Sequence, residues 1–402
     1  MNEFQEHQVN LTWAEPKKSY DVVIVGGGGH GLSCAYHLAT RHNITNVAVI
    51  ERKYIGGGNS GRNTTIIRSN YGIPEAVRFY QRSVDLYNRL EEETGRWIMQ
   101  KKMPILWMAH TEASLKAEQA RTEVNKAFGA HTEFVTPQQI KELCPLIDIT
   151  GAGVWPVLGA SLHWESSTAR HDRVNWALAE GAMKRGVHVL QRTAVVGLLK
   201  QGDRVVGVKT DKGDISAKIV VSAVGGHVTS LASMAGLRLP IRTHPLQAYV
   251  TNHFAQHLDV IVSSVGLGIY VSQTARGELL IGANIDPQPS YSYRSGHTLI
   301  QSCSHRAITL LPFLRNLRIL RQWTGVCDMS VDYSPIMGKT DVEGFYLTTG
   351  WGTWGFKAIP ASGEQMAELI ATGETPELIA PFSLDRFAKD RPMADRGSAG
   401  TH

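Results

Sequence analysis

The sequence has few cysteines, no long apolar run and no block of like charges. Its four cysteines are scattered over 402 residues and form no C-x-x-C pair, which argues against a zinc site and a disulfide framework. No apolar stretch is long enough to span a bilayer, and the polar N-terminus lacks a signal-peptide core. The formal net charge of +5 comes from interspersed charges, so nucleic-acid binding finds no support. We therefore expect a cytoplasmic protein of one large or two medium domains.

Glycine, by contrast, is abundant, and its first cluster follows a short apolar strand, Tyr20–Val25. Gly26, Gly28 and Gly31 match the spacing G-x-G-x-x-G. In this pattern the glycines allow a tight turn, close approach of the backbone to a pyrophosphate and close packing of the next helix. The helix would direct its N-terminal N–H groups at that phosphate. The stretch therefore predicts a dinucleotide-binding unit.

The residue that ends the next expected strand narrows the choice of dinucleotide. Glu51 follows Val47–Ile50 and stands 20 residues beyond Gly31. A carboxylate at this place accepts hydrogen bonds from the ribose hydroxyls of an adenosine and disfavours a 2′-phosphate. The residues therefore favour FAD or NAD over NADP and leave those two open.

The order of the remaining segments predicts a mixed α/β and α+β fold with two domains. Apolar strands at residues 215–223 and 345–349 resemble returns to the first sheet, so its Rossmann-like domain would be discontinuous. We assign to this nucleotide-binding domain residues 18–75, 150–240 and 320–385. A second, substrate domain on a mixed or antiparallel sheet would comprise residues 76–149 and 241–319. The ends would form terminal arms, residues 1–17 and 386–402.

Two further segments carry specific expectations. Residues 54–71 begin with a second glycine cluster, which suggests backbone lying against a flat ligand. Residues 112–128 predict a polar helix that faces solvent.

Six motifs in the chain resemble the glycine-oxidase-like, FAD-dependent amine oxidoreductases, above all the family of β subunits of heterotetrameric sarcosine oxidase. The motifs are residues 20–31, 62–71, 156–160, 169–172, 244–248 and 350–357. The resemblance covers nearly the whole chain from about residue 18. It implies that the dinucleotide is FAD, held without a covalent bond. The residues expected to hold FAD are Gly26, Gly28, Gly29, His30, Gly31, Glu51, Arg52, Gly58, Asn59, Ser60, Arg62, Thr64, Thr65, Ile66, Val195, Gly225, Gly352, Thr353, Gly355, Phe356 and Lys357.

The resemblance also implies a site for an amino-acid substrate. In the family an arginine and a lysine hold the substrate carboxylate, and the matching residues here are Arg68 and Lys357. The expected reaction moves a hydride from the carbon next to the substrate nitrogen to flavin N5, giving an imine. Because Lys357 would stand at the start of a helix, positive potential there would favour a reduced, anionic flavin.

A second flavin and partner subunits follow from the same resemblance. The family carries FMN bound covalently through a histidine, which matches His171 here. The residues alone favour another interpretation, in which His171 precedes a helix that Asp172 caps. Family relatives work as heterotetramers with a large NAD- and folate-binding α subunit and two small subunits, γ and δ, with FMN at the α–β boundary.

The chain departs from the family patterns at three places. Trp354 stands where the family usually has glycine, and its indole would narrow the substrate pocket or change the amine that fits. Cys327 falls near the place where single-chain sarcosine oxidases tether FAD, although a buried, inert thiol is the other interpretation. Those enzymes also have an oxygen-activating lysine near the stretch that reads Glu278–Leu280 here. The missing lysine favours transfer of electrons to a second flavin.

Three functions are therefore compatible with the sequence. The first is oxidation of sarcosine or a similar secondary amino acid, with electrons relayed from FAD to FMN and then to oxygen. The second is an L-proline or other amine dehydrogenase that uses a quinone or dye. The third is a flavin-bearing assembly subunit without turnover.

Overall fold

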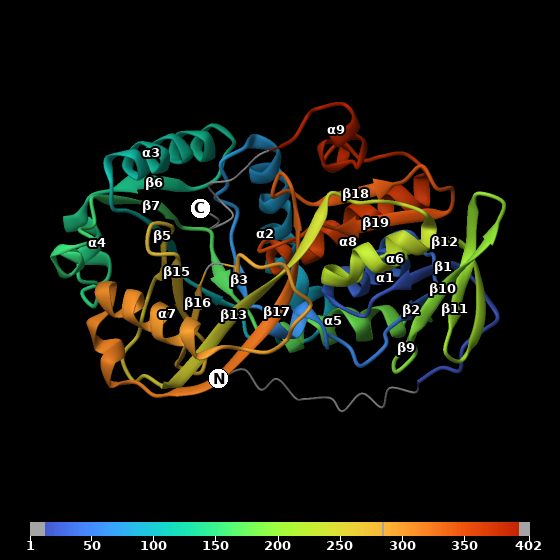
Figure 1. Cartoon of the computed structure of the whole chain (residues 1–402), viewed down its shortest axis with the longest axis horizontal. Helices are drawn as coiled ribbons and strands as arrows, with labels where there is room; N and C mark the ends of the chain where they lie inside the picture. Colours follow the sequence, from blue (N-terminus) through green and yellow to red (C-terminus); the bar gives the residue numbers. More distant parts are fainter. Residues whose placement is uncertain (1–12, 284, 394–402) are drawn as a thin grey trace.

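The computed structural model describes residues 13–283 and 285–393. The chain forms two large sheets with associated helices, and these make two lobes that lie side by side (Figure 1). The mixed α/β and α+β fold class that the sequence predicts is confirmed. Residues 1–12 and 394–402, which hold most of the expected terminal arms, lie outside the described residues.

The first sheet contains the expected parallel strands. Its order is β10-β11-β12-β1-β2-β9, with β19 paired to β12 and β18 paired to β19; the strands are β1 (Ser19–Val25), β2 (Val47–Ile50), β9 (His188–Leu190), β10 (Val195–Gln201), β11 (Arg204–Thr210), β12 (Gly213–Ser222), β18 (Ile336–Lys339) and β19 (Phe345–Thr349). Strands β12, β1, β2 and β9 are parallel neighbours, and β19 is parallel to β12. The chain therefore returns to this sheet twice, as the sequence predicts.

Helices cover both faces of the first sheet. One group comprises α1 (Gly29–Arg41), α2 (Pro74–Thr94), α5 (His171–Met183) and α8 (Gly355–Thr372), while α6 (Val228–Ala235) belongs to the core cluster on the other face. Helix α1 packs against α5 and α8, and α2 packs against α8. This cover explains why the strands are apolar on both sides. None of the helices that the structure describes is long and apolar enough to cross a bilayer.

The second sheet is mostly antiparallel. Its order is β17-β13-β16-β15-β14-β5-β7-β6, and its strands are β5 (Ile105–Ala109), β6 (Thr132–Val135), β7 (Gly159–His163), β13 (Ile241–His253), β14 (Ile261–Ser264), β15 (Ile269–Gln273), β16 (Glu278–Ala283) and β17 (Ile319–Ser330). Strands β14 and β5 form a parallel pair. The helices of this lobe are α3 (Glu112–Ala127), α4 (Pro137–Leu143) and α7 (His297–Leu310) (Figure 1).

Two strands lie in a different sheet from the one that the sequence analysis assigns them to. Residues 159–163 and 319–330 were expected in the nucleotide-binding domain, apart from residue 319. Instead, β7 pairs with β5 and β6, and β17 pairs with β13, all in the second sheet. The sheet to which a strand belongs depends on its pairing with strands that are distant in the sequence. A local sequence pattern does not predict that pairing.

Helix α3 and the C-terminal segment also differ from expectation. The expected solvent-facing helix buries one polar face, formed by Glu118, Arg121, Thr122 and Asn125. In the expected C-terminal arm, Arg386 of α9 (Asp385–Ala388) is only 4% exposed and donates to the buried carboxylate of Asp332 at 2.8 and 2.9 Å. Both corrections involve buried charged groups: Glu118 and Arg121 pair within one helical turn, and Arg386 pairs with Asp332, which stands 54 residues earlier.

Short elements complete the chain. A small sheet joins β3 (Ile66–Ile67), β8 (Ser167–Thr168) and β4 (Lys101–Lys102). The 3-10 turns are η1 (Asn59–Arg62), η2 (Gly151–Gly153), η3 (Gly225–His227), η4 (Pro312–Asn316) and η5 (Ala380–Phe382).

Candidate active site

A cavity of about 470 Å³ is bordered by both sheets. It brings together nearly all residues that the sequence analysis assigns to FAD and substrate. The predicted residues that line it are Gly26, Gly28, Gly29, His30, Glu51, Arg52, Gly58, Asn59, Ser60, Arg62, Thr64, Thr65, Ile66, Arg68, Val195, Gly225, Gly352, Thr353, Gly355, Phe356 and Lys357. Gly31 and His171 are the two predicted site residues that do not line it.

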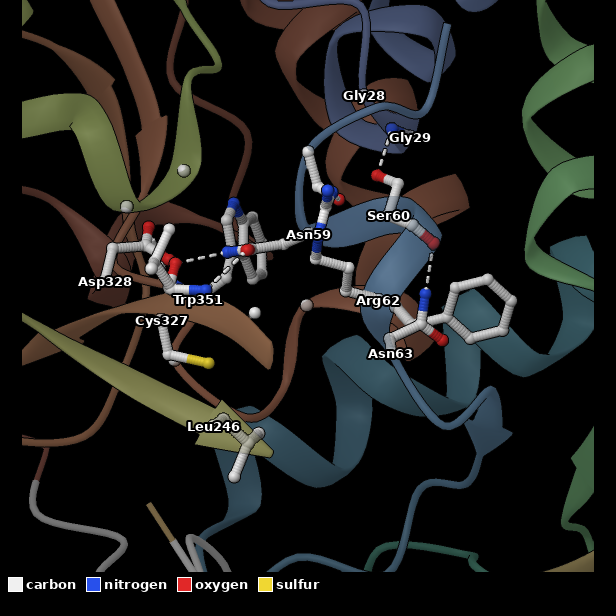
Figure 2. A pocket seen from close by; sticks show the side chains of 18 of the residues that line it. Gly28, Gly29, Asn59, Ser60, Arg62, Asn63, Leu246, Cys327, Asp328 and Trp351 are labelled. Atoms are coloured by element: carbon white, nitrogen blue, oxygen red, sulfur yellow. Dashed lines mark hydrogen bonds between the residues drawn. The ribbon is translucent and has the colours of Figure 1, made fainter. Parts of the chain in front are cut away.

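One end of the cavity is formed by the glycine turn after β1. The backbone N–H of Gly29 donates to Ser60 Oγ at 2.8 Å, which joins the start of α1 to turn η1 (Figure 2). Asn59 in the same turn ties it to β17, because its Oδ1 accepts from the N–H of Val326 at 2.9 Å. The second glycine cluster therefore folds against the first.

Gly31 acts behind the cavity wall. A Cβ atom at Gly31 would lie 2.1 Å from the carbonyl oxygen of Gly26 and 3.2 Å from Ile24 Cγ2. Glycine is required here so that α1 can pack close to β1. This is the packing role that the sequence pattern predicts.

Glu51 is held firmly at the end of β2. Its carboxylate accepts from the N–H of Gly27 at 2.9 Å and from the N–H of Lys53 at 2.8 Å. These bonds fix the carboxylate beside the glycine turn, where it lines the cavity.

At the other end, Asp328 of β17 organises the turn before α8. Its Oδ2 accepts from the Thr349 hydroxyl at 2.9 Å and from the N–H of Gly350 at 2.6 Å. It also accepts from the N–H of Trp351 at 3.2 Å (Figure 2). Burial raises the pKa of this carboxyl, and the three donors oppose that rise. A residue of the second sheet thereby fixes a turn that follows a strand of the first sheet.

The first turn of α8 places Lys357 at the cavity. The side chain is 8% exposed, and its Nζ donates to the carbonyl oxygen of Thr353 at 3.2 Å. Burial, followed by the positive charge of Arg68, holds the pKa of Lys357 well below its usual value. An anion that enters the cavity would oppose both effects and favour the protonated ammonium group.

Arg68 lies immediately after β3 and is 3% exposed. Its Nη1 donates to the carbonyl oxygen of Asn70 at 2.8 Å and to Asn70 Oδ1 at 2.9 Å. The guanidinium carbon also lies 4.4 Å from the ring centroids of both Tyr71 and Trp107. Aromatic faces and amide oxygens therefore hold this cation in one place at the cavity wall.

Trp354 does not narrow the cavity, so that expectation is wrong. Its indole is 1% exposed and lies 4.7 Å from the ring of Tyr71 and 5.9 Å from the ring of Tyr80, in the helical core. The neighbouring Trp351 lines the cavity instead and stacks on His30 at 4.2 Å. In this turn the indole of Trp354 therefore packs in the core, while the indole of Trp351 faces the cavity.

The other two departures from the family can also be placed. Cys327 lines the cavity, and burial strongly raises the pKa of its thiol, which favours the inert form. Residues Glu278–Leu280 of β16 do not line the cavity, whereas Ala283 at the end of the same strand does. Among the described lining residues, the lysines are Lys53 and Lys357.

His171 lies in a second cavity, of about 390 Å³, that shares Arg62 with the first. Its other lining residues include Tyr54, Trp176 and Trp323. Within the described part of the chain, His171 Nδ1 is buried and has no hydrogen-bond partner, and burial lowers the pKa of the imidazole. The side chain is therefore neutral near pH 7.

The alternative interpretation of His171 as the residue ahead of a helix capped by Asp172 is wrong. His171 is the first residue of α5, its N-cap is Arg170, and Asp172 lies in the first turn. Asp172 pairs with Arg170 at 2.9 and 3.0 Å.

Several lining residues were missed by the sequence analysis. Trp351 stands inside the motif of residues 350–357, so it could have been found there. Trp107 and Tyr270 come from strands of the second sheet, where the local pattern signals only burial. Gly282 leaves room for Tyr270, because a Cβ atom there would lie 2.1 Å from the tyrosine ring.

A family model described as FAD dependent oxidoreductase matches residues 21–369. This chain belongs to the FAD-dependent oxidoreductase family. The cofactor FAD and the enzyme class, a flavoprotein oxidoreductase, are thereby confirmed.

Named relatives of this FAD-dependent oxidoreductase agree with the resemblance that the motifs indicate. It is 44% identical over 389 residues to sarcosine oxidase subunit beta of Arthrobacter sp, covering 96% of both chains. It is 42% identical over 390 residues to sarcosine oxidase subunit beta of Rhodobacter capsulatus, covering 96% of this chain and 94% of that one. The crystal structure of L-proline dehydrogenase from P. horikoshii superposes with a TM-score of 0.88 at 30% identity, covering 93% of this chain and 99% of that one.

The cavity of this FAD-dependent oxidoreductase fits the phosphate end of its cofactor. Gly28 is the N-cap of α1 and has no capping side chain. The N–H of Gly29 donates to Ser60 Oγ, and the N–H groups that follow it in the first turn can face a phosphate. A Cβ atom at Gly58 would meet nothing within 4 Å, which shows that the second glycine cluster borders open space. Glu51 supplies a carboxylate for the ribose hydroxyls.

Proposed function

We propose that this chain oxidises sarcosine or a similar secondary amino acid at a carbon next to the nitrogen. The observation that carries the proposal is the pair of buried basic side chains, Arg68 and Lys357, in one cavity with the dinucleotide turn. An amino acid presents one carboxylate that can satisfy both cations. The relatives that bear the name sarcosine oxidase subunit beta support this choice of substrate.

The chain's own residues would orient the substrate. Arg68 can bind the carboxylate with two parallel hydrogen bonds, while Lys357 acts as a point charge. A carboxylate fixed at two points leaves the nitrogen-bearing carbon in a restricted position, which makes the transfer effectively intramolecular. Bound FAD supplies the hydride acceptor at flavin N5. The indoles of Trp107 and Trp351 line the cavity and limit the access of water.

Electrons would then pass from FAD to FMN and on to oxygen. The second cavity supports a flavin bound through His171, because it offers a neutral imidazole whose Nδ1 is buried and has no hydrogen-bond partner among the described residues. Arg62 borders both cavities, so the two flavins would be near neighbours. The subunit names of the relatives support work in a multi-subunit enzyme. The α, γ and δ subunits are the partners that the resemblance of the motifs implies.

We expect His171→Ala to abolish covalent flavin while FAD stays bound. The substitution removes the nitrogen that would carry the flavin and leaves the first cavity unchanged. Acid precipitation of the protein, purified with its partners, should give a yellow pellet for wild type and a colourless one for the variant. His188→Ala, at a half-buried imidazole in β9, is the matched control and should keep the colour. A colourless wild-type pellet would remove the covalent assignment.

A second candidate is an L-proline or other amine dehydrogenase that passes electrons to a quinone or dye. The similarity to the L-proline dehydrogenase structure specifically favours it. Proline is also a secondary amino acid with one carboxylate, so the same pair of cations would serve. The third candidate, an assembly subunit without turnover, depended on a pocket narrowed by Trp354, and that side chain lies in the core.

Anaerobic reduction of the purified assembly tests the three candidates. Sarcosine, L-proline and N,N-dimethylglycine are added separately, and bleaching of the flavin absorbance is followed. We expect sarcosine to give the highest second-order rate constant for reduction of the flavin. Faster reduction by proline would favour the second candidate, and no bleaching with any amine would favour the third. Oxygen uptake with the preferred amine then identifies the acceptor.

A further inference from the structure

The buried polar face of α3 lies behind the wall of the substrate cavity. Glu118 is 4% exposed and Arg121 is 6% exposed, and neither lines the cavity. The two side chains form an ion pair at 3.5 Å across one helical turn. A buried pair of this kind is costly to desolvate, so its presence beside a site requires a reason.

Trp107 connects this ion pair to the cavity. The guanidinium carbon of Arg121 lies 5.0 Å from the Trp107 ring centroid, and that of Arg68 lies 4.4 Å from it. Two guanidinium groups therefore share one indole, which itself lines the cavity. Their mutual repulsion has to be balanced by an anion, and Glu118 provides a carboxylate in contact with Arg121.

The pKa of the Glu118 carboxyl depends on the charges of both arginines. Burial raises the pKa of Glu118 to about 7, while the charges of Arg121 and then Arg68 oppose this rise. Glu118 therefore attracts both guanidinium groups that lie near the Trp107 ring, and it contacts that of Arg121. Arg68 also lies 4.4 Å from the Tyr71 ring centroid, so a guanidinium that shifts away from Trp107 would keep its contact with Tyr71.

We propose that Glu118 is a positioning residue that, through Arg121 and Trp107, fixes the guanidinium of Arg68 for a substrate carboxylate. The inference rests on the proposed function, because it requires that Arg68 binds that carboxylate. Bidentate binding depends on the orientation of the guanidinium plane, so a small shift of Arg68 costs affinity. The opposing effect, a more positive cavity after loss of an acid, would strengthen carboxylate binding.

Binding of two matched ligands separates these effects. Methoxyacetate keeps the substrate carboxylate and replaces the amine by an ether, and methoxyacetamide is its uncharged counterpart. Dissociation constants are measured from the absorbance change of the flavin-loaded protein at a pH of about 8, where Glu118 is largely ionised. We expect wild type to prefer methoxyacetate, and Glu118→Gln to lower that preference by about tenfold. Binding of methoxyacetamide should change little.

Controls distinguish positioning from loss of structure. Glu180→Gln removes the charge of another buried helical acid paired with an arginine, Arg96, and should keep the wild-type preference. Glu118→Asp should restore part of the preference, because it keeps the carboxylate. Where Glu118→Gln does not yield folded protein, Arg121→Gln tests the same contacts and should lower the preference likewise.

The outcomes separate this inference from the proposed function. A wild-type protein that binds both ligands equally contradicts the substrate site itself. A wild-type preference that Glu118→Gln retains or increases overturns the positioning role of Glu118 alone. Equal loss of affinity for both ligands also overturns it, because it indicates a general disturbance of the cavity.

Discussion

Lys357→Met is expected to lower kcat/KM for the amine substrate by about a hundredfold to a thousandfold, the usual loss when one charged group is removed from an active site. Methionine has a similar length and tolerates burial, so the first turn of α8 should keep its conformation. What disappears is an ammonium group at the cavity wall, held there by the carbonyl oxygen of Thr353 at 3.2 Å. FAD should stay bound, since most of its expected contacts lie elsewhere.

Steady-state kinetics with the preferred amine and the flavin absorbance of the purified variant check this expectation. Lys200→Met is the matched control, because Lys200 also donates to a backbone carbonyl oxygen, that of Ala235 at 2.9 Å, but lies outside the cavity. It should keep wild-type kinetics. Unchanged kinetics in Lys357→Met would show that the carboxylate is not bound by this lysine.

Gly31→Ala should greatly reduce the FAD content of the purified protein and destabilise it by about 2 kcal/mol, a typical cost of overpacking. The added methyl group would lie 2.1 Å from the carbonyl oxygen of Gly26, so α1 has to move away from β1. That movement opens the turn that is expected to receive the pyrophosphate. Both folding and cofactor binding therefore depend on this one contact.

The ratio of flavin to protein absorbance and the midpoint of urea unfolding measure the two effects of Gly31→Ala. Gly296→Ala serves as control: its φ of −114° is open to any residue, and a Cβ atom there would meet nothing within 4 Å. This control should retain FAD. A Gly31→Ala protein with full flavin content and unchanged stability would contradict the packing role of Gly31.

Local patterns were sufficient to predict the elements that hold the dinucleotide. The strand before Gly26, the helix after it and the carboxylate of Glu51 follow from short-range periodicity and from the conformational freedom of glycine. The same holds for α2, which begins at Pro74, ends at Thr94 and is capped by Gly95 with a φ of +67°. Such features are decided by neighbours in the sequence.

Features decided by distant partners escaped prediction. Strand β17 was assigned to the wrong sheet because its partner, β13, begins 78 residues earlier in the chain. The inward direction of Trp354 depends on contacts with Tyr71 and Tyr80. The buried face of α3 consists of residues that normally indicate solvent, and only the arginine–indole cluster behind the cavity explains their burial.

One stretch of eight residues forms part of the wall of both cavities. It runs from residue 55 to residue 62. Gly57, Gly58, Asn59 and Ser60 line the first cavity, Ile55, Gly56 and Gly61 line the second, and Arg62 lines both. A substitution in this stretch is therefore expected to affect both cavities. Variants made here to study the chemistry of one chamber have to be assayed for the contents of the other as well.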